Sequence, residues 1–161
     1  MEKMCDAINE ASDIMALSFA SHLYIEYSIN ELVVTKFIKP KLVIDDNNLG
    51  SFGSKVQLLE ALGLFDHVPN ALKNIKIIQG IRNYYAHNLV VEESTPQPVK
   101  DRITKLVYFE NNDIPCDYDV PYSEHAEPLH SQLHVCAMAT NNALIIINEE
   151  QDSAHQSTTA P

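Results

Sequence analysis

The amino-acid sequence predicts an all-α helical bundle, and three observations support this fold class. Apolar residues recur mostly in steps of four from Met4 to Tyr27, which is the spacing of a helical stripe. Residues 1–39 contain neither Pro nor Gly. The short apolar runs 106–109 and 144–147 lie inside helical patterns, so nothing indicates a strand.

The length of 161 residues suits one domain. We place this domain at residues 1–150 and expect a disordered polar tail at 151–161. The first helical region runs to about Phe37, before Pro40. One straight helix of that length is too long for a small domain, so we expect a break or bend near residues 20–22.

Local signals predict the ends of the later helices, which are expected at 52–62, 70–89, 99–109 and from a start near 123–128. Ser51 is expected to cap the first of them and Gly63 to stop it. Asn70 is expected to cap the next helix, and Pro98 suits the first turn of the third. The inward face predicted for 52–62 consists of Phe52, Val56, Leu59 and Leu62.

The charge of the chain is strongly acidic and unevenly distributed. The formal net charge is −11, from 22 acids and 11 bases. Residues 1–105 contain all 11 bases, whereas residues 106–161 contain nine acids and no Lys or Arg. Nucleic-acid affinity depends mainly on Lys and Arg that neutralise phosphates, so the composition argues against a whole-surface nucleic-acid binder. It favours a protein partner with a basic surface.

The sequence gives no sign of a membrane span, a signal peptide or a cofactor site. The longest apolar runs, such as 143–148, are far too short to span a membrane, and the N-terminus lacks the pattern of a signal peptide. The three cysteines, at positions 5, 116 and 136, are widely spaced and odd in number, which favours a reducing compartment. We therefore expect a cytoplasmic protein with no cofactor.

The strongest local motif is Ile81-Arg82-Asn83-Tyr84-Tyr85-Ala86-His87-Asn88, late in a predicted helix. Metal-free cleavage of a phosphodiester needs a group that titrates near neutral pH and a fixed cation, which His87 and Arg82 supply. Asn83 shares a helix face with His87.

A structural interpretation of the same residues is also open. Arg82 then pairs with an acid such as Glu60 or Asp66, and His87 fixes the end of the helix and the turn after it. On this interpretation, replacing His87 with alanine reduces stability or dimerisation more than any activity.

Residues 48–89 resemble the core of the mannitol operon repressor family and its relatives in the HEPN superfamily of helical domains. The resemblance lies in a Gly-bearing loop, a helix with the pattern K-x-x-L-L-x-x-L-G-L from Lys55, and a helix ending in I-R-N-x-x-A-H-N from Ile81. It implies a helical bundle that often dimerises.

The resemblance implies two different functions. In catalytic HEPN proteins the corresponding motif is a ribonuclease site, which would make Arg82 and His87 catalytic and Asn83 their polar neighbour. This interpretation requires a groove lined by basic residues, here Lys55, Lys73 and Lys76. The mannitol-repressor branch implies a non-catalytic regulator that acts through protein contacts, and the acidity of the chain favours this second function.

An acidic stretch rich in tyrosine is the expected docking surface. Acids steer a basic partner, and tyrosines anchor it. Such a protein regulates an operon through a partner, or acts as an antitoxin or immunity protein against a basic nuclease toxin. The residues assigned to partner binding are Glu110, Asp113, Asp117, Tyr118, Asp119, Tyr122 and Glu124.

A histidine cluster near the C-terminal helix has a weaker pattern. His130 and His134 are four residues apart, a spacing that can chelate a metal, and His125 and Cys136 are close in sequence. No third ligand is fixed by the spacing. We therefore assign no metal site and expect Cys136 to be a small core residue.

Overall fold

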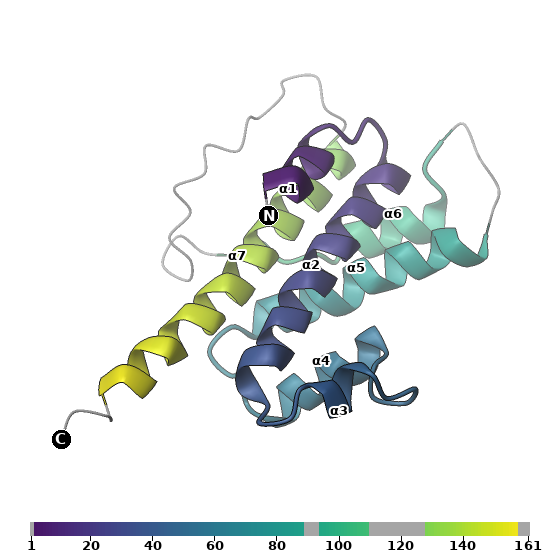
Figure 1. The fold of residues 1–161 in the computed structure, drawn as a ribbon. Coiled ribbons are helices and arrows are strands. Elements are labelled where there is room, and N and C mark those ends of the chain that lie inside the picture. Colours follow the sequence, from purple (N-terminus) through teal and green to yellow (C-terminus); the bar gives the residue numbers. More distant parts are fainter. Residues whose placement is uncertain (1, 89–93, 110–127, 158–161) are drawn as a thin grey trace.

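The computed structural model describes residues 2–88, 94–109 and 128–157, and within these ranges it contains helices and no strand (Figure 1). The predicted all-α class is confirmed. The helices are α1 (Glu2–Asn9), α2 (Ile14–Lys36), α3 (Lys41–Ile44), α4 (Phe52–Ala61), α5 (Pro69–His87), α6 (Gln97–Ile103) and α7 (Pro128–Ser157).

Helices α2 and α7 lie side by side and run in the same direction (Figure 1). Two polar pairs fix their register. Ser28 Oγ donates to Asn141 Oδ1 at 2.6 Å, and Thr35 Oγ1 donates to Asn148 Oδ1 at 2.7 Å. Both pairs join residues that are 113 positions apart in the sequence. The second pair lies seven residues, or one heptad, after the first pair on both helices.

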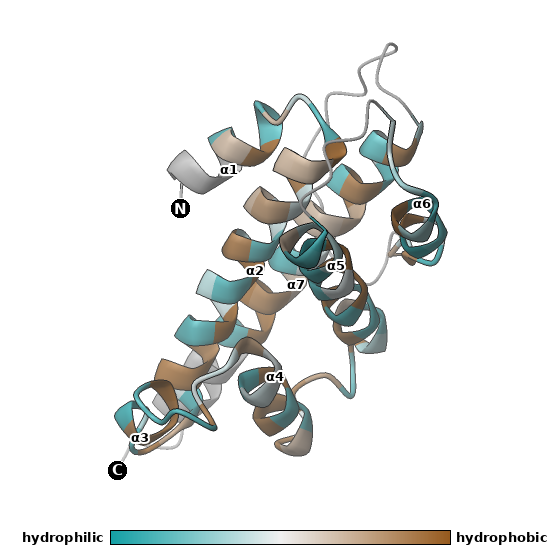
Figure 2. Ribbon diagram, turned by 90° about the vertical axis from the view of Figure 1, so that its right-hand side faces the viewer, coloured by the Kyte–Doolittle hydropathy of each residue, from teal (hydrophilic) through white to brown (hydrophobic). Residues whose placement is uncertain are grey.

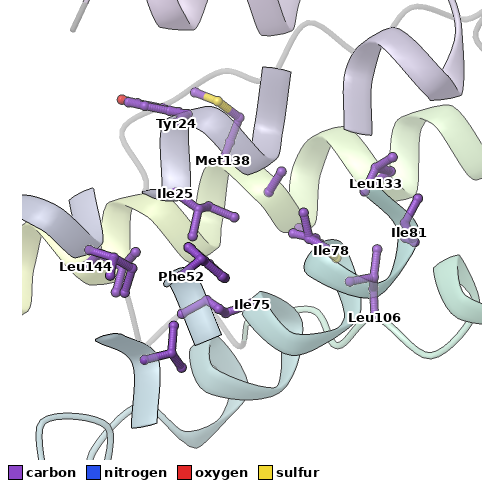
Figure 3. Close-up of a cluster of buried hydrophobic side chains, with 14 of the residues drawn as sticks. Tyr24, Ile25, Phe52, Ile75, Ile78, Ile81, Leu106, Leu133, Met138 and Leu144 are labelled. Carbon is purple, nitrogen blue, oxygen red and sulfur yellow. The ribbon is translucent and has the colours of Figure 1, made fainter. Parts of the chain in front are cut away.

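The core lies where α2, α5 and α7 meet (Figure 3). Each helix contributes fully buried aliphatic side chains, and α4 adds Phe52 and Leu59. Burial of such side chains removes apolar surface from water and is the main source of stability. The contributing residues include Ile25, Ile29, Leu32, Ile75, Ile78, Ile81, Leu133 and Leu144.

The break in the N-terminal helical region comes earlier than predicted. Helix α1 ends at Asn9, and α2 then continues without interruption through residues 20–22. The Asp13 side chain accepts a hydrogen bond from the Ala16 N–H at 2.8 Å. This N-cap starts α2, so a polar capping residue, rather than a bend in an apolar run, sets the boundary.

The buried face of α2 also differs from the apolar stripe. Leu23 and Tyr27 are exposed, whereas Ser18, Ser21 and Ser28 are buried. Ser18 Oγ donates to the Met15 carbonyl and Ser28 bonds Asn141, so these two side chains are compatible with burial. The Ser21 hydroxyl is buried without a hydrogen-bond partner among the described residues. Helix α2 mixes hydrophobic and hydrophilic residues along its length (Figure 2) and has no single apolar face, so hydrophobicity alone did not select its inward face.

Several later boundaries agree with the sequence signals. Ser51 accepts from the Ser54 N–H at 3.2 Å and caps α4, and Gly63 follows with a φ of 74°, a conformation that favours glycine. Leu62 is 51% exposed, so its inward assignment was wrong. Helix α5 begins at Pro69, whose fixed φ suits a first helical residue, rather than after an Asn70 cap.

The two C-terminal helices differ in length from the prediction. Helix α6 ends at Ile103, because the following segment bonds to α5 instead of continuing the helix. Helix α7 runs to Ser157 and so includes residues 151–157, which the sequence assigned to the tail. Neither Gly nor Pro interrupts the sequence between Pro128 and Pro161.

None of the helices in the described ranges combines the length and the apolar character that crossing a membrane requires.

Candidate functional site

Helix α5 carries all three residues of the R-N-x-x-x-H motif in its last two turns. Its buried face contains Ile75, Ile78 and Ile81. Arg82 lies at the edge of this face, because it is four residues after Ile78. His87 is five residues after Arg82, which places it about 140° further around the helix axis. The two residues therefore project from different sides of α5.

Arg82 lies against α2. It is half-buried, its Nη1 donates to Asn83 Oδ1 at 3.2 Å, and its guanidinium carbon lies 5.9 Å from the centre of the Phe19 ring. No carboxylate lies within ion-pair distance of Arg82 in the part of the chain that the structure describes. The expected pairing with Glu60 or Asp66 is absent, since Glu60 instead binds Lys76 at 2.9 Å.

A second histidine, His22 of α2, lies near Arg82. His22 is 7% exposed, its ring centre is 4.6 Å from that of Phe52, and its Nδ1 is 3.8 Å from Glu26 Oε2. Burial lowers the pKa of His22; Glu26 opposes this shift, and the Arg82 charge adds to it. Sequence reasoning missed His22, because three separate helices create its surroundings. Its one sequence signal is the spacing of Phe19, His22 and Glu26 on one helix face.

His87 is exposed at the end of α5. The helix end is fixed by Asn88, whose Nδ2 and backbone N–H both donate to the Tyr84 carbonyl, at 2.8 and 3.0 Å. Within the described residues, Asn88 rather than His87 makes the contacts that fix the end of α5, and the turn that His87 was also expected to fix lies outside them. Because exposed surface residues contribute little to folding, replacement of His87 with alanine should change stability by less than about 0.5 kcal/mol.

Of the three lysines expected around a groove, two share the outer face of α5 with His87. Lys73 and Lys76 are both exposed, and helical spacing places them on the same side as His87. Lys55 is not part of this face: it is buried, and its Nζ donates to Asn30 Oδ1 of α2 at 2.8 Å. The structure thus divides the predicted basic groove, and Arg82 lies apart from Lys73, Lys76 and His87.

A cation from another helix, Arg102 of α6, also lies against α5. Its guanidinium carbon lies 5.9 Å from the centre of the Tyr84 ring, and its Nη1 donates to the Pro98 carbonyl at 2.8 Å. Arg102 also lies next to Gly80, where a Cβ would be 3.4 Å from Arg102 Nε, an ordinary contact distance. Sequence reasoning gave Arg102 no role, since it is 20 residues away from the motif.

The C-terminal histidines hold the end of α1. His130 Nε2 donates to the Ala11 carbonyl at 3.0 Å, and His134 Nε2 donates to Asn9 Oδ1 at 3.1 Å. Burial lowers the pKa of His134, and His130 lowers it further. Among the described residues, no three His, Cys, Asp or Glu side chains are placed to hold one metal ion.

Cys136 is fully buried, as expected for a core residue, and burial raises the pKa of its thiol to about 12. A thiol with this pKa is a poor nucleophile at neutral pH.

The expected docking residues, from Glu110 to Glu124, and His125 lie outside the described residues. No protein-family model matches the chain, and neither a curated protein nor a solved structure matches it.

Proposed function

We propose that this chain is a non-catalytic, acidic regulator or neutraliser that acts by binding another protein, as its resemblance to the mannitol operon repressor family implies. The observation that carries this proposal is the separation of Arg82 from His87 on α5. A phosphodiester cleaved by these two groups must contact both, and in one protomer they project from different sides of the helix.

The distribution of charge supports a basic protein as the partner. The nine acids of residues 106–161 have no Lys or Arg among them, so this part of the chain attracts positive surfaces. Helix α2 adds an apolar contribution, since Leu23, Tyr27 and Val34 share one helix face and are 57%, 39% and 48% exposed. Exposed apolar groups beside charged ones are typical of protein-binding surfaces.

The test of this function reverses four acids of the expected docking surface to lysine: Asp113, Asp117, Asp119 and Glu124. We expect the tagged wild-type chain to retain a basic protein from its own cells and the reversed variant to lose it. In titration calorimetry, the purified partner should then give a heat of binding with wild type and none with the reversed variant.

The matched control makes the same change of eight charge units on the described surface, at Asp6, Glu10, Glu31 and Asp45, all of which are exposed. This control variant should bind the partner as wild type does, apart from a slower association. Equal affinity in the docking-surface variant would contradict the proposal.

A metal-independent ribonuclease is the second candidate, and one observation favours it. Arg82 has no carboxylate partner among the described residues, so its charge is free to meet a phosphate. Arg82 and His87 of two copies would then have to face each other across an interface.

Total RNA from cells that express wild type or His87→Ala tests this candidate. We expect the same RNA fragments from both, because His87 is exposed and distant from Arg82 around the helix. New cleavage products with wild type alone would establish the ribonuclease and overturn the proposed non-catalytic function.

A further inference from the structure

Helices α5 and α6 lie side by side (Figures 1 and 2), and several bases line the seam between them. Asn74 of α5 bonds Val107, which follows α6 in the sequence. Further along α5, Gly80 lies next to Arg102 of α6. The two helices therefore run antiparallel, and residue 105 lies between these two contacts. We define the basic strip as Lys73, Lys76, Arg102 and Lys105, of which the lysines are exposed and the arginine is half-buried.

The described residues neutralise only part of the charge of the basic strip. Lys76 pairs with Glu60 at 2.9 Å, whereas the other three bases of the strip have no carboxylate within ion-pair distance in the described ranges. Asp101, on the same helix as Arg102, instead accepts a hydrogen bond from Gln97 at 2.7 Å. The strip is therefore a locally positive surface on a chain with 22 acids and 11 bases.

Arg102 is held in a position that suits a carboxylate ligand. One of its N–H groups is bound to the Pro98 carbonyl at 2.8 Å, and its guanidinium carbon lies 5.9 Å from the centre of the Tyr84 ring. These two contacts restrict the side chain before any ligand arrives, so little conformational freedom remains to be lost on binding. The N–H groups that are not bound to Pro98 can donate two parallel hydrogen bonds to one carboxylate.

We infer that the basic strip binds a short acidic segment of another protein. One carboxylate of that segment takes the bidentate contact with Arg102, and others lie beside Lys73 and Lys105. From Lys73 to Tyr84, helix α5 rises by about 16 Å, a length that an extended peptide of about five residues covers. A run of a few Asp or Glu residues therefore matches the strip in both charge and length.

The charge of the whole chain favours an acidic peptide over a polynucleotide. A polynucleotide carries a phosphate at every nucleotide, so its ends extend past the strip and meet a chain whose formal net charge is −11. A protein segment can confine its carboxylates to the few residues that contact the strip. This surface goes beyond the proposed function, because it attracts a partner of the opposite charge and uses none of the expected docking residues.

Fluorescence anisotropy with two labelled peptides tests this inference. One probe has about six consecutive glutamates, enough to cover the strip, and the other has glutamines in their place. In about 0.1 M salt, the wild-type chain should bind the glutamate probe saturably and should not bind the glutamine probe. Salt of about 1 M reduces the screening length to about 3 Å and should abolish the binding.

Two variants locate the binding surface. Lys73→Gln with Lys105→Gln should weaken binding of the glutamate probe roughly tenfold, because it removes two charges of the strip. Arg102→Lys keeps the charge but loses the planar pair of donors, and it should also weaken binding roughly tenfold. The matched control, Lys39→Gln with Lys41→Gln, removes two exposed charges outside the strip and should bind the probe as wild type does.

The inference is overturned by wild type that does not bind the glutamate probe, or by either strip variant binding it as tightly as wild type. A control variant that loses as much affinity as the strip variants also contradicts it, because the attraction would then not depend on the strip. If a single-stranded oligonucleotide of matched charge binds more tightly than the glutamate probe, the strip is a polynucleotide site and the inference is wrong. None of these variants alters an acid, so the proposed function, whose test reverses acids, is judged separately.

Discussion

Replacing Asn74 with alanine should lower the free energy of unfolding by about 2–4 kcal/mol. Asn74 is fully buried on α5, and its side chain bonds both polar groups of the Val107 backbone, with distances of 2.8 and 2.9 Å. Alanine removes both bonds. It leaves the Val107 N–H without this partner and the Val107 carbonyl with only the Cys136 thiol, a weak donor at 3.7 Å, and an unsatisfied buried group costs about 1–3 kcal/mol.

Urea unfolding monitored by circular dichroism measures this loss. Asn70→Ala is the matched control, since it makes the same substitution in the first turn of the same helix, where the Asn70 side chain makes no hydrogen bond to the described residues. It should change stability by less than about 0.5 kcal/mol. An Asn74→Ala variant as stable as the control would mean that Val107 is held by other contacts.

The second large expected effect is a loss of stability as the pH falls below the pKa of an unperturbed histidine, about 6.5. The pKa values of His22 and His134 are both lowered in the folded chain, mainly by burial. The unfolded chain, in which histidine has a pKa near 6.5, therefore binds more protons between 6.5 and the lowered folded pKa values. Stability contributed by the two neutral side chains is complete above pH 6.5 and declines as the pH falls through this window.

The urea midpoint should therefore decrease between about pH 8 and about pH 5. The lower limit stays above the range of Asp46, whose pKa is also lowered, by backbone hydrogen bonds from Leu49 and Asn48. The variants His22→Gln and His134→Gln should each flatten the dependence, while His67→Gln, which removes an exposed histidine, should leave it unchanged. A midpoint that rises on acidification would refute the assignment.

Local signals predicted the parts of the fold that local chemistry determines. The Ser51 cap and the left-handed Gly63 each depend on a few neighbouring residues, and both are present. The inward face of α2 was not predictable in the same way. Leu23 and Tyr27 are as apolar as residues that are buried, and the choice is made by α7, whose Asn141 meets Ser28.

In the candidate site, too, local geometry was predictable from the sequence, whereas contacts between distant helices were not. The angle between Arg82 and His87 follows from helix geometry alone, so their separation was foreseeable. The surroundings of each were not. Arg82 meets Phe19 from α2, and Arg102 from α6 lies over Tyr84 of α5. Such contacts depend on how distant helices pack, and spacing within one helix carries no information about that.

The parallel pairing of α2 with α7 has a consequence for how the chain folds during synthesis. The partners in this pair are 113 residues apart, so α2 leaves the ribosome long before the helix that covers it. At about 5–20 residues per second, the delay is roughly 6–23 s. Throughout this time the apolar sides of α2 lack their largest neighbour. Contacts of such high sequence separation slow folding. The core of this small helical protein is therefore completed late, when α7 from the C-terminal part packs against α2 from the N-terminal part.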